Sequence, residues 1–342
     1  MIFFRADGNS QIGSGHIMRC LAIAEEARDI GEKSIFITAA DDMSAVIKGK
    51  SFNNIVLQSD YRNMESEDII PLLWEYANPT IIVDSYYVSK PYLEILKRYC
   101  EENCGKLVYI DDIKKYAYPC DVLIDYQIHA QVDEYNTIYE GEKKPKLLLG
   151  TNYVPLRKEF LLSVNRRVKE KADNIIVTTG GSDPEHMAIE LVKVAKNIKK
   201  TFHFVIGAVN TDCRLIEEEA KHCNNINIHV NATNISELMQ NCDVAISAAG
   251  STLYELCATQ TPTVTFVSAD NQIPIAEGFS TKGIIYNCGD VRDLGANGLA
   301  EKLVKEALLL CENYDKRCLC AEEMKTVVDG YGTNRIIKEI FE

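Results

Sequence analysis

Short apolar runs recur along the first half of the chain, and each gives way to polar residues or glycine. Such runs are typical of buried strands, and apolar positions at helical spacing after the first of them predict a helix. In this half the runs lie at residues 1–4, 34–38, 55–57, 80–83, 107–110, 122–124 and 147–149. Strands that alternate with helices in this way predict a doubly wound parallel sheet.

The same alternation restarts beyond a polar stretch at residues 141–171. Strands are expected at residues 174–178, 202–206, 226–230, 244–247 and 263–267, and helices at 187–198, 235–239, 299–310 and 321–340. We therefore expect two Rossmann-like α/β domains, residues 1–157 and 158–342, with the boundary near residues 155–165. The pattern leaves open whether the last helix packs back on the first domain.

The first strand leads through a glycine-containing loop, residues 5–16, into the first helix. His16 falls on the first helical turn, where backbone N–H groups and the helix dipole favour the neutral imidazole. A neutral histidine beside an anionic substrate is a candidate general base or acid, and Gly13 and Gly15 let a ligand approach the backbone. An equally simple interpretation is that the glycines form a turn that His16 caps, because their spacing matches neither the Rossmann nor the P-loop fingerprint.

Acidic residues follow several of the expected strands. Asp84, Asp111 and Asp125 each end an apolar run, and open parallel sheets bind ligands just outside the carboxyl ends of their strands. Asp84 and Tyr86 are therefore candidates for holding a polar ligand. The alternative is that Asp84 and Asp111 cap the helices that follow them.

Two loops of small residues in the second half, residues 179–184 and 248–252, each lead into an expected helix. Together they predict an anion site, since helix N-termini and exposed backbone N–H groups bind phosphate. Glu255 lies one turn beyond the second loop, where a carboxylate can accept the hydroxyls of a ribose. Asn271 and Gln272 follow the next strand and add to the candidate phosphate site.

Composition narrows the class of protein. The chain has 342 residues, 46% of them hydrophobic, and a formal net charge of −13. This charge excludes general nucleic-acid binding, which needs a basic surface, but it is compatible with one phosphorylated small molecule held by backbone donors. Polar residues begin at position 5, and no apolar run approaches the roughly 20 residues of a membrane span. We expect a soluble, cytoplasmic protein.

The cysteine and histidine patterns give no metal site. The twelve cysteines include two close pairs, Cys100 with Cys104 and Cys318 with Cys320, and neither has a second pair at zinc-finger spacing. We expect reduced thiols, several of them buried as small hydrophobic residues. The other histidines occur singly along the sequence, at His129, His186, His203, His222 and His229. No metal and no cofactor are expected.

Three motifs resemble a known family. Residues 5–21, 83–86 and 149–157 resemble PseG, the UDP-sugar hydrolase family of pseudaminic acid biosynthesis, and its spore-coat relative SpsG. The glycine loops of the second half resemble the nucleotide-binding half of GT-B glycosyltransferases related to MurG. The resemblance implies a GT-B architecture, with two Rossmann-like domains facing across a cleft.

It also implies an activity and a set of residues. PseG-like proteins remove UDP from UDP-2,4-diacetamido-2,4,6-trideoxy-β-L-altropyranose through metal-independent, inverting attack of water on the anomeric carbon, and the catalytic histidine of the family falls on His16. The implied sugar-binding residues are Asp7, Gly13, Gly15, Asp84, Tyr86, Asn271 and Gln272. The implied nucleotide-binding residues are Gly181, Ser182, Ala232, Gly250, Ser251, Thr252 and Glu255. Ser85 stands where the family often has histidine, which affects the sugar more than the nucleotide.

Two other functions remain open. One is a GT-B glycosyltransferase that passes the sugar from UDP to an acceptor, and the other is a nucleotide-sugar-binding protein without activity. MurG-like enzymes attach to membranes through an apolar, basic patch, and here Lys48, Lys50 and Phe52 form no clear basic and apolar helix. We therefore expect a UDP-sugar as the partner and no association with a membrane surface, and the oligomeric state stays open.

Overall fold

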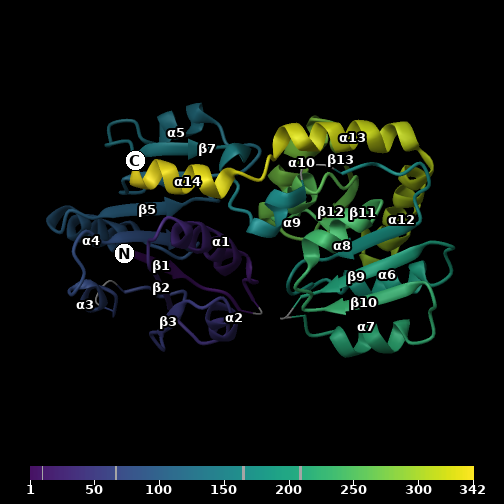
Figure 1. Ribbon diagram of the computed structural model, residues 1–342, viewed down its shortest axis with the longest axis horizontal. Coiled ribbons are helices and arrows are strands. Elements are labelled where there is room, and N and C mark those ends of the chain that lie inside the picture. The colour runs from purple at the N-terminus through teal and green to yellow at the C-terminus, as the bar shows by residue number, and fades with distance from the viewer. Residues whose placement is uncertain (10, 66–67, 164–165, 208–209) are drawn as a thin grey trace. The chain divides into compact units, whose positions relative to one another are not determined.

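The computed structural model describes residues 1–9, 11–65, 68–163, 166–207 and 210–342 (Figure 1). Its contacts divide the chain into two compact units. Unit 1 comprises Met1–Arg157 together with Tyr331–Glu342, and unit 2 comprises Lys158–Gly330. Ser10 of the first loop and residues 164–165 of the expected boundary lie outside the described residues.

Unit 1 is built on a seven-stranded sheet whose strands all pair in parallel, in the order β3-β2-β1-β4-β5-β6-β7. The strands are β1 (Ile2–Ala6), β2 (Ser34–Thr38), β3 (Asn53–Val56), β4 (Thr80–Asp84), β5 (Lys106–Ile110), β6 (Val122–Asp125) and β7 (Lys146–Leu149). The central strands β1 and β4 are buried along their whole length. They read as continuous apolar runs because helices cover both faces of such a sheet.

The helices of unit 1 include the one that carries His16. They are α1 (Gly15–Asp29), α2 (Ser44–Gly49), α3 (Ile70–Leu73), α4 (Lys90–Glu102), α5 (Val132–Ile138), the 3₁₀ helix η2 (Thr151–Tyr153) and α14 (Gly332–Phe341). Ser89 caps α4, because its side chain accepts a hydrogen bond from the backbone N–H of Tyr92. This cap is independent of Asp84, so the expectation that Asp84 caps the next helix is wrong.

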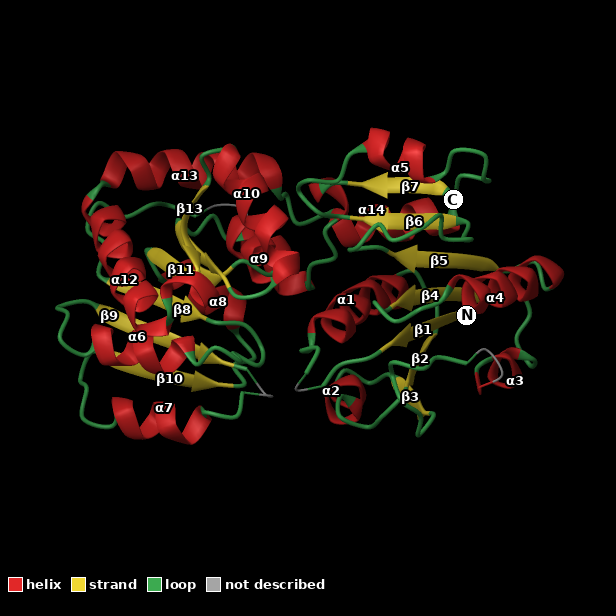
Figure 2. Cartoon of the chain, turned by 180° about the vertical axis from the view of Figure 1, so that it is seen from behind, coloured by secondary structure: helices red, strands yellow, loops and turns green. Residues whose placement is uncertain are grey.

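Unit 2 contains a six-stranded parallel sheet in the order β10-β9-β8-β11-β12-β13, visible in Figure 2. Its strands are β8 (Asn174–Thr178), β9 (Thr201–Ile206), β10 (Ile226–Val230), β11 (Val244–Ala248), β12 (Thr263–Val267) and β13 (Ile285–Asp290). Its helices are η3 (Lys158–Ser163), α6 (Met187–Ala195), α7 (Cys213–Ala220), α8 (Ile235–Asn241), α9 (Thr252–Ala258), η4 (Asp270–Gln272), α10 (Ile273–Thr281), α11 (Val291–Leu294), α12 (Ala296–Glu312) and α13 (Tyr314–Val327).

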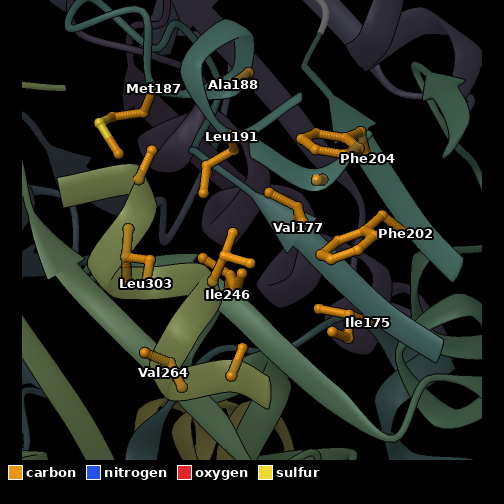
Figure 3. Close-up of a cluster of buried hydrophobic side chains, with 14 of the residues drawn as sticks. Ile175, Val177, Met187, Ala188, Leu191, Phe202, Phe204, Ile246, Val264 and Leu303 are labelled. Atoms are coloured by element: carbon orange, nitrogen blue, oxygen red, sulfur yellow. The ribbon is translucent and has the colours of Figure 1, made fainter. Parts of the chain in front are cut away.

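The core of unit 2 forms where α6 and α12 pack on one face of this sheet. Figure 3 shows Phe202 and Phe204 of β9 beside Val177 of β8, with Leu191 and Leu303 contributed by the two helices. All five side chains are buried. Alternate residues of each strand therefore supply this face, as the pleat of a β-strand requires.

The sequence pattern predicts both parallel sheets correctly, but it misplaces one helix and misses one strand. The helix expected over residues 321–340 is wrong, because α13 ends at Val327 and α14 begins at Gly332, with Gly330 between them at φ +83°. Strand β13 was not expected, because Asn287 and Gly289 interrupt its apolar pattern. Its pairing with β12 shifts register at that point, and Gly289 has φ +120°.

Helix α14 belongs to unit 1 by its contacts, although most of unit 2 precedes it in the sequence. Figure 1 shows this yellow helix among the purple and blue elements of unit 1. It packs against α1 and η2, and the Thr333 hydroxyl donates to the carbonyl of Leu156 (2.9 Å). Asn334 donates to the carboxylate of Glu26 on α1 (3.1 Å). The helix that carries His16 is thus braced by residues that lie more than 300 positions later.

No helix among the described residues is both long enough and apolar enough to cross a bilayer.

Candidate active site

In both sheets the chain reverses its direction of winding at one point, between β1 and β4 in unit 1 and between β8 and β11 in unit 2. Ligands of open α/β sheets bind beside such a switch point, outside the carboxyl ends of the strands. In unit 1 the segments that leave these two strands carry His16 and Asp84. In unit 2 they are the two glycine loops.

His16 lies on the first turn of α1 and is 6% exposed. Its Nδ1 is 2.6 Å from Oδ1 of Asp84, at the end of β4. A nitrogen lone pair and a carboxylate oxygen repel at this distance, so a proton lies between them and Nδ1 is the protonated nitrogen. No described residue bonds to Nε2. In its neutral form the ring would therefore carry its free lone pair on Nε2, as a general base requires.

Arg19, one turn after His16 on α1, binds the same carboxylate with two donors. Its Nε is 2.5 Å from Oδ2 of Asp84 and its Nη2 is 2.5 Å from Oδ1. This is the bidentate geometry in which a planar guanidinium fixes the plane of a carboxylate. Arg19 Nη2 also lies 3.0 Å from Nδ1 of His16, so the imidazole has a carboxylate and a guanidinium as direct neighbours.

The network continues to the ends of β5 and β6. Asp112 follows β5 and accepts from Arg19 Nη2 (2.7 Å), from the Tyr86 hydroxyl (3.1 Å) and from Gln127 Nε2 (3.1 Å). Tyr126 follows β6, and its phenol oxygen accepts from Arg19 Nη1 (2.5 Å). The ring of Tyr86 meets the His16 ring edge-on, with centroids 4.6 Å apart. Residues that leave four strands thus converge around His16 within unit 1.

Charge balance in this buried network keeps Asp84 ionised. Burial acts to raise the pKa of Asp84, but the charge of Arg19 and the hydrogen bonds from Arg19 and His16 outweigh it and hold that pKa well below its usual range. Burial opposes the charge of Arg19 as well, yet Asp112 and Asp84 together raise its pKa well above normal. Burial, reinforced by Asp112, raises the pKa of Tyr86. Tyr86 is therefore a neutral hydrogen-bond donor at every physiological pH.

The sequence analysis predicted His16, Asp84 and Tyr86 and missed Arg19, Asp112 and Tyr126. Arg19 had a visible signal, because a residue three positions after His16 lies on the same helix face. Asp112 and Tyr126 had a weaker one, since each directly follows an aspartate, Asp111 or Asp125, that ends an apolar run. Asp111 and Asp125 make other hydrogen bonds. Asp111, for example, accepts from the backbone N–H groups of Ile113 and Lys114 (2.9 Å each) in a turn. Residues 111–121, all of them described, form no helix between β5 and β6, so the alternative that Asp111 caps the next helix is wrong.

The remaining predicted residues of the first loop shape the backbone. Asp7 is 5% exposed, and both of its carboxylate oxygens are bonded within unit 1, to Arg5 Nη1 (2.5 Å) and to the backbone N–H of Ala39 (2.6 Å). Gly13 has φ +74° and pairs with Asn9 in a short antiparallel bridge. Gly15 begins α1, and no atom lies within 4 Å of where its Cβ would be. The loop thus leaves the N-terminus of α1 open to a ligand.

The two glycine loops of unit 2 differ in whether their backbone N–H groups already have acceptors. No described residue accepts from the backbone N–H groups of Gly250, Ser251 and Thr252, which precede and begin α9. Three consecutive free donors of this kind form an anion-binding concavity. At the other loop, the first donors of α6 are occupied, because the carboxylate of Asp183 accepts from the N–H groups of Met187 and Ala188. Phosphate binding is therefore better served by the α9 loop.

The other predicted residues of unit 2 occupy the same carboxyl edge of its sheet. Gly181 and Ser182 are half-buried after β8, Ala232 is half-buried after β10, and Glu255 is half-buried on α9. Asn271 is exposed after β12, whereas the side-chain oxygen of Gln272 accepts from the N–H and hydroxyl groups of Ser268 (2.9 and 3.2 Å). The sugar-site set is thus divided, with Asn271 and Gln272 in unit 2 and the others in unit 1.

The histidines outside the site are less isolated than their sequence positions suggested. His203 and His229 lie on the paired strands β9 and β10, with Nδ1 of the first 3.2 Å from Nε2 of the second. His186 pairs with Asp212, which raises its pKa through a hydrogen bond. Parallel pairing thus brings together two histidines that are distant in the sequence. Among the described residues, no group of three or more histidines, cysteines or acidic residues could hold a metal ion.

Solved structures of the same shape are glycosyltransferases. MurG of Acinetobacter baumannii superposes with a TM-score of 0.67 at 12% identity, over 99% of both chains. The calicheamicin glycosyltransferase CalG4 gives a TM-score of 0.63 at 10% identity, over 99% of this chain and 97% of that one. The chain has the GT-B fold. The expected fold class is thereby confirmed, with one parallel sheet in each unit of this GT-B protein.

Curated relatives of the GT-B chain carry the names that its motifs suggested. It is 24% identical over 285 residues to the UDP-2,4-diacetamido-2,4,6-trideoxy-β-L-altropyranose hydrolase of Campylobacter jejuni, covering 82% of this chain and 97% of that protein. It is 21% identical over 350 residues to the spore coat polysaccharide biosynthesis protein SpsG of Bacillus subtilis, covering 98% and 97%. The predicted resemblance to PseG and SpsG is thus confirmed.

Other relatives of the GT-B chain are longer proteins. It is 26% identical over 279 residues to a Helicobacter pylori protein named as a pseudaminic acid cytidylyltransferase and UDP-2,4-diacetamido-2,4,6-trideoxy-β-L-altropyranose hydrolase. The chain spans about half the length of two relatives that it matches, 45% of the H. pylori protein and 54% of an uncharacterised protein from Methanocaldococcus jannaschii. No family model matches the chain.

Proposed function

We propose that this chain hydrolyses a UDP-linked amino sugar, with His16 as the general base. The observation that carries the proposal is the 2.6 Å contact between His16 Nδ1 and Asp84 Oδ1. It directs the lone pair of the ring to Nε2, the nitrogen that no described residue occupies. A histidine held in this way by a carboxylate is well suited to accept a proton from water.

The reaction then needs one activated water. As the water oxygen forms a bond to the anomeric carbon, its proton passes to Nε2 of His16, and the bond from that carbon to the diphosphate oxygen breaks. Attack opposite the leaving group inverts the anomeric configuration, and UDP departs with the bonding electron pair. Asp84 stabilises the imidazolium that forms, because Nδ1–H already donates to its carboxylate.

Unit 2 supplies the nucleotide side of this proposal. UDP departs as an anion, so donors placed on the diphosphate lower the barrier without a general acid. The free N–H groups of Gly250, Ser251 and Thr252 are the donors we assign, and Glu255 on the following helix is assigned to the ribose. Gly181, Ser182 and the backbone at Ala232 complete the nucleotide contacts, while Tyr86, Asn271 and Gln272 are assigned to the sugar. Asp84 is fully buried with both carboxylate oxygens bonded to His16 and Arg19, so we assign it to His16 rather than to the sugar.

The names of the relatives support the choice of substrate. Two of them are named as hydrolases of the same UDP-diacetamido sugar, and a third is named for spore coat polysaccharide biosynthesis. We therefore propose UDP-2,4-diacetamido-2,4,6-trideoxy-β-L-altropyranose, or a close relative, as the substrate. Release of UDP that continues in excess EDTA would support metal-independent chemistry.

Substitution of His16 tests the mechanism. We expect His16→Asn to lower the turnover number by about 100-fold or more, because a general base contributes at least that factor. Its affinity for UDP, measured by calorimetry, should be unchanged. His222→Ala is the matched control, since His222 is an exposed histidine of unit 2. Full turnover in His16→Asn would remove His16 from the mechanism.

Transfer of the sugar to an acceptor is the second candidate, and the transferase fold of the solved neighbours favours it. Incubation with UDP-diacetamido and UDP-monoacetamido hexoses, with and without candidate acceptors, separates the possibilities. UDP release without an acceptor identifies a hydrolase, and release that requires an acceptor identifies a transferase. Binding without release identifies a nucleotide-sugar-binding protein.

A further inference from the structure

We infer that Arg19 is a positioning residue that keeps His16 neutral by neutralising Asp84. This inference rests on the proposed role of His16 as a base. Arg19 contacts neither the reacting carbon nor water in the proposal. Its effect is transmitted through the carboxylate that it shares with His16.

The geometry places the cation where it opposes a second proton on the ring. Arg19 Nη2 is 3.0 Å from Nδ1 of His16, and both groups converge on Oδ1 of Asp84. With Nδ1 already protonated, Arg19 cannot donate to that nitrogen, so the contact is one between a positive charge and an N–H dipole. Protonation of Nε2 would place a full positive charge on the ring beside the guanidinium. Arg19 therefore disfavours the imidazolium electrostatically, while Asp84 favours it.

The remaining groups around His16 show why this balance depends on Arg19. The charged and titratable neighbours are Arg19 and Cys20 on α1, Asp84 and Tyr86 at the end of β4, Asp112 after β5 and Tyr126 after β6. Asp84 and Asp112 are the two anions, and Arg19 is the one cation of this set. Without Arg19, the carboxylates of Asp84 and Asp112 would lose their shared counter-charge, and the ring of His16, which contacts Asp84, would supply it by taking up a proton.

An arginine is suited to this position because it binds three acceptors in one plane. Two of its donors fix the Asp84 carboxylate, while Nη2 reaches Asp112 (2.7 Å) and Nη1 reaches Tyr126 (2.5 Å). A lysine at the same place would supply the positive charge without the planar set of donors that binds a carboxylate through two bonds. Charge and geometry can therefore be separated experimentally by comparing Arg19→Lys with Arg19→Gln.

The test observes the protonation of His16 directly, by ¹⁵N NMR of its ring nitrogens, with the signals assigned through His16→Asn. In the wild type we expect the neutral ring protonated on Nδ1 at pH 7. In Arg19→Gln we expect His16 to take up its second proton at a pH higher by about one unit or more, since a charged neighbour within about 4–6 Å has an effect of that size. Arg19→Lys should restore most of the wild-type behaviour. Arg28→Gln is the control, because Arg28 is an exposed arginine of the same helix.

Activity supplies the second measurement. The acid limb of the kcat profile should move to higher pH in Arg19→Gln, by the same interval as the NMR signal, with the KM for the UDP-sugar changed less than kcat. A purely structural role for Arg19 gives a lower Tm with unchanged His16 protonation in every folded variant, and this result would overturn the inference. The NMR measurement needs no turnover. An inactive wild type, or a fully active His16→Asn, therefore refutes the hydrolase without deciding the role of Arg19.

Discussion

Gly332, the first residue of α14, is a position where one methyl group should disturb unit 1. A Cβ there would lie 2.3 Å from the carbonyl oxygen of Val154 and 2.5 Å from its nitrogen. Both are backbone atoms that no rotamer change can move. Ordinary contacts begin near 3.4 Å, so Gly332→Ala requires α14 and the segment around Val154 to separate by about 1 Å.

The size of the effect follows from the two ways in which α14 can respond. Overpacking a dense core costs about 1–3 kcal/mol when neighbouring groups can shift. Complete release of the helix would expose Ile336, Ile337 and Ile340, which are at most 3% exposed, at about 1.5–3 kcal/mol for each side chain. Because the first response costs less, we expect a displaced but bound helix and a loss of about 1–3 kcal/mol in the free energy of unfolding of unit 1.

Urea denaturation and hydrogen–deuterium exchange measure both parts of this expectation. Gly332→Ala should unfold at lower urea, and amides of residues 332–341 and of α1 should exchange faster, while those of unit 2 keep their protection. Gly298→Ala is the matched control, since Gly298 lies in helix α12 with no atom within 4 Å of its Cβ position. It should gain up to about 1 kcal/mol from helix propensity. Wild-type stability and exchange in Gly332→Ala would refute the close approach.

Two further predictions concern single carboxylates. Glu255→Ala should weaken UDP binding in calorimetry and abolish any preference for UDP over 2′-deoxy-UDP, because the ribose hydroxyls lose their acceptor; unchanged UDP affinity would refute the ribose assignment. Asp125 is fully buried, which raises its pKa to about 7, above the unfolded value of about 3.9. The native state thus binds this proton more tightly, and the associated stability is complete below about pH 4 and is lost as the pH rises through 7. Asp125→Asn should flatten this decline, by up to about 1.4 kcal/mol per pH unit between pH 4 and 7, in urea unfolding series; an unchanged slope would show that other groups cause it.

Most strands were predictable from the sequence because the central ones are buried on both sides, which leaves an apolar run such as residues 81–83 of β4. Strand β13 carries polar residues and a register shift. Its own sequence pattern therefore does not predict a strand, which is defined only by its pairing with β12. His16 was predictable from its place on a helix turn after a glycine loop. Arg19 was harder to assign, because a sequence does not show that the ends of three further strands deliver Asp84, Asp112 and Tyr126 to one guanidinium.

Helix α14 belongs to unit 1 although it comes last in the sequence, and this affects the order in which the two units can fold during synthesis. Unit 2 is one uninterrupted stretch, so it can fold as soon as residues 158–330 have left the ribosome. Unit 1 has to wait for residues 331–342, and until they arrive the surface of α1 that they cover stays uncovered. The helix bearing the proposed base is therefore packed on this side only after all of unit 2 has been synthesised, and a chain that stops short of α14 would carry that helix without its brace.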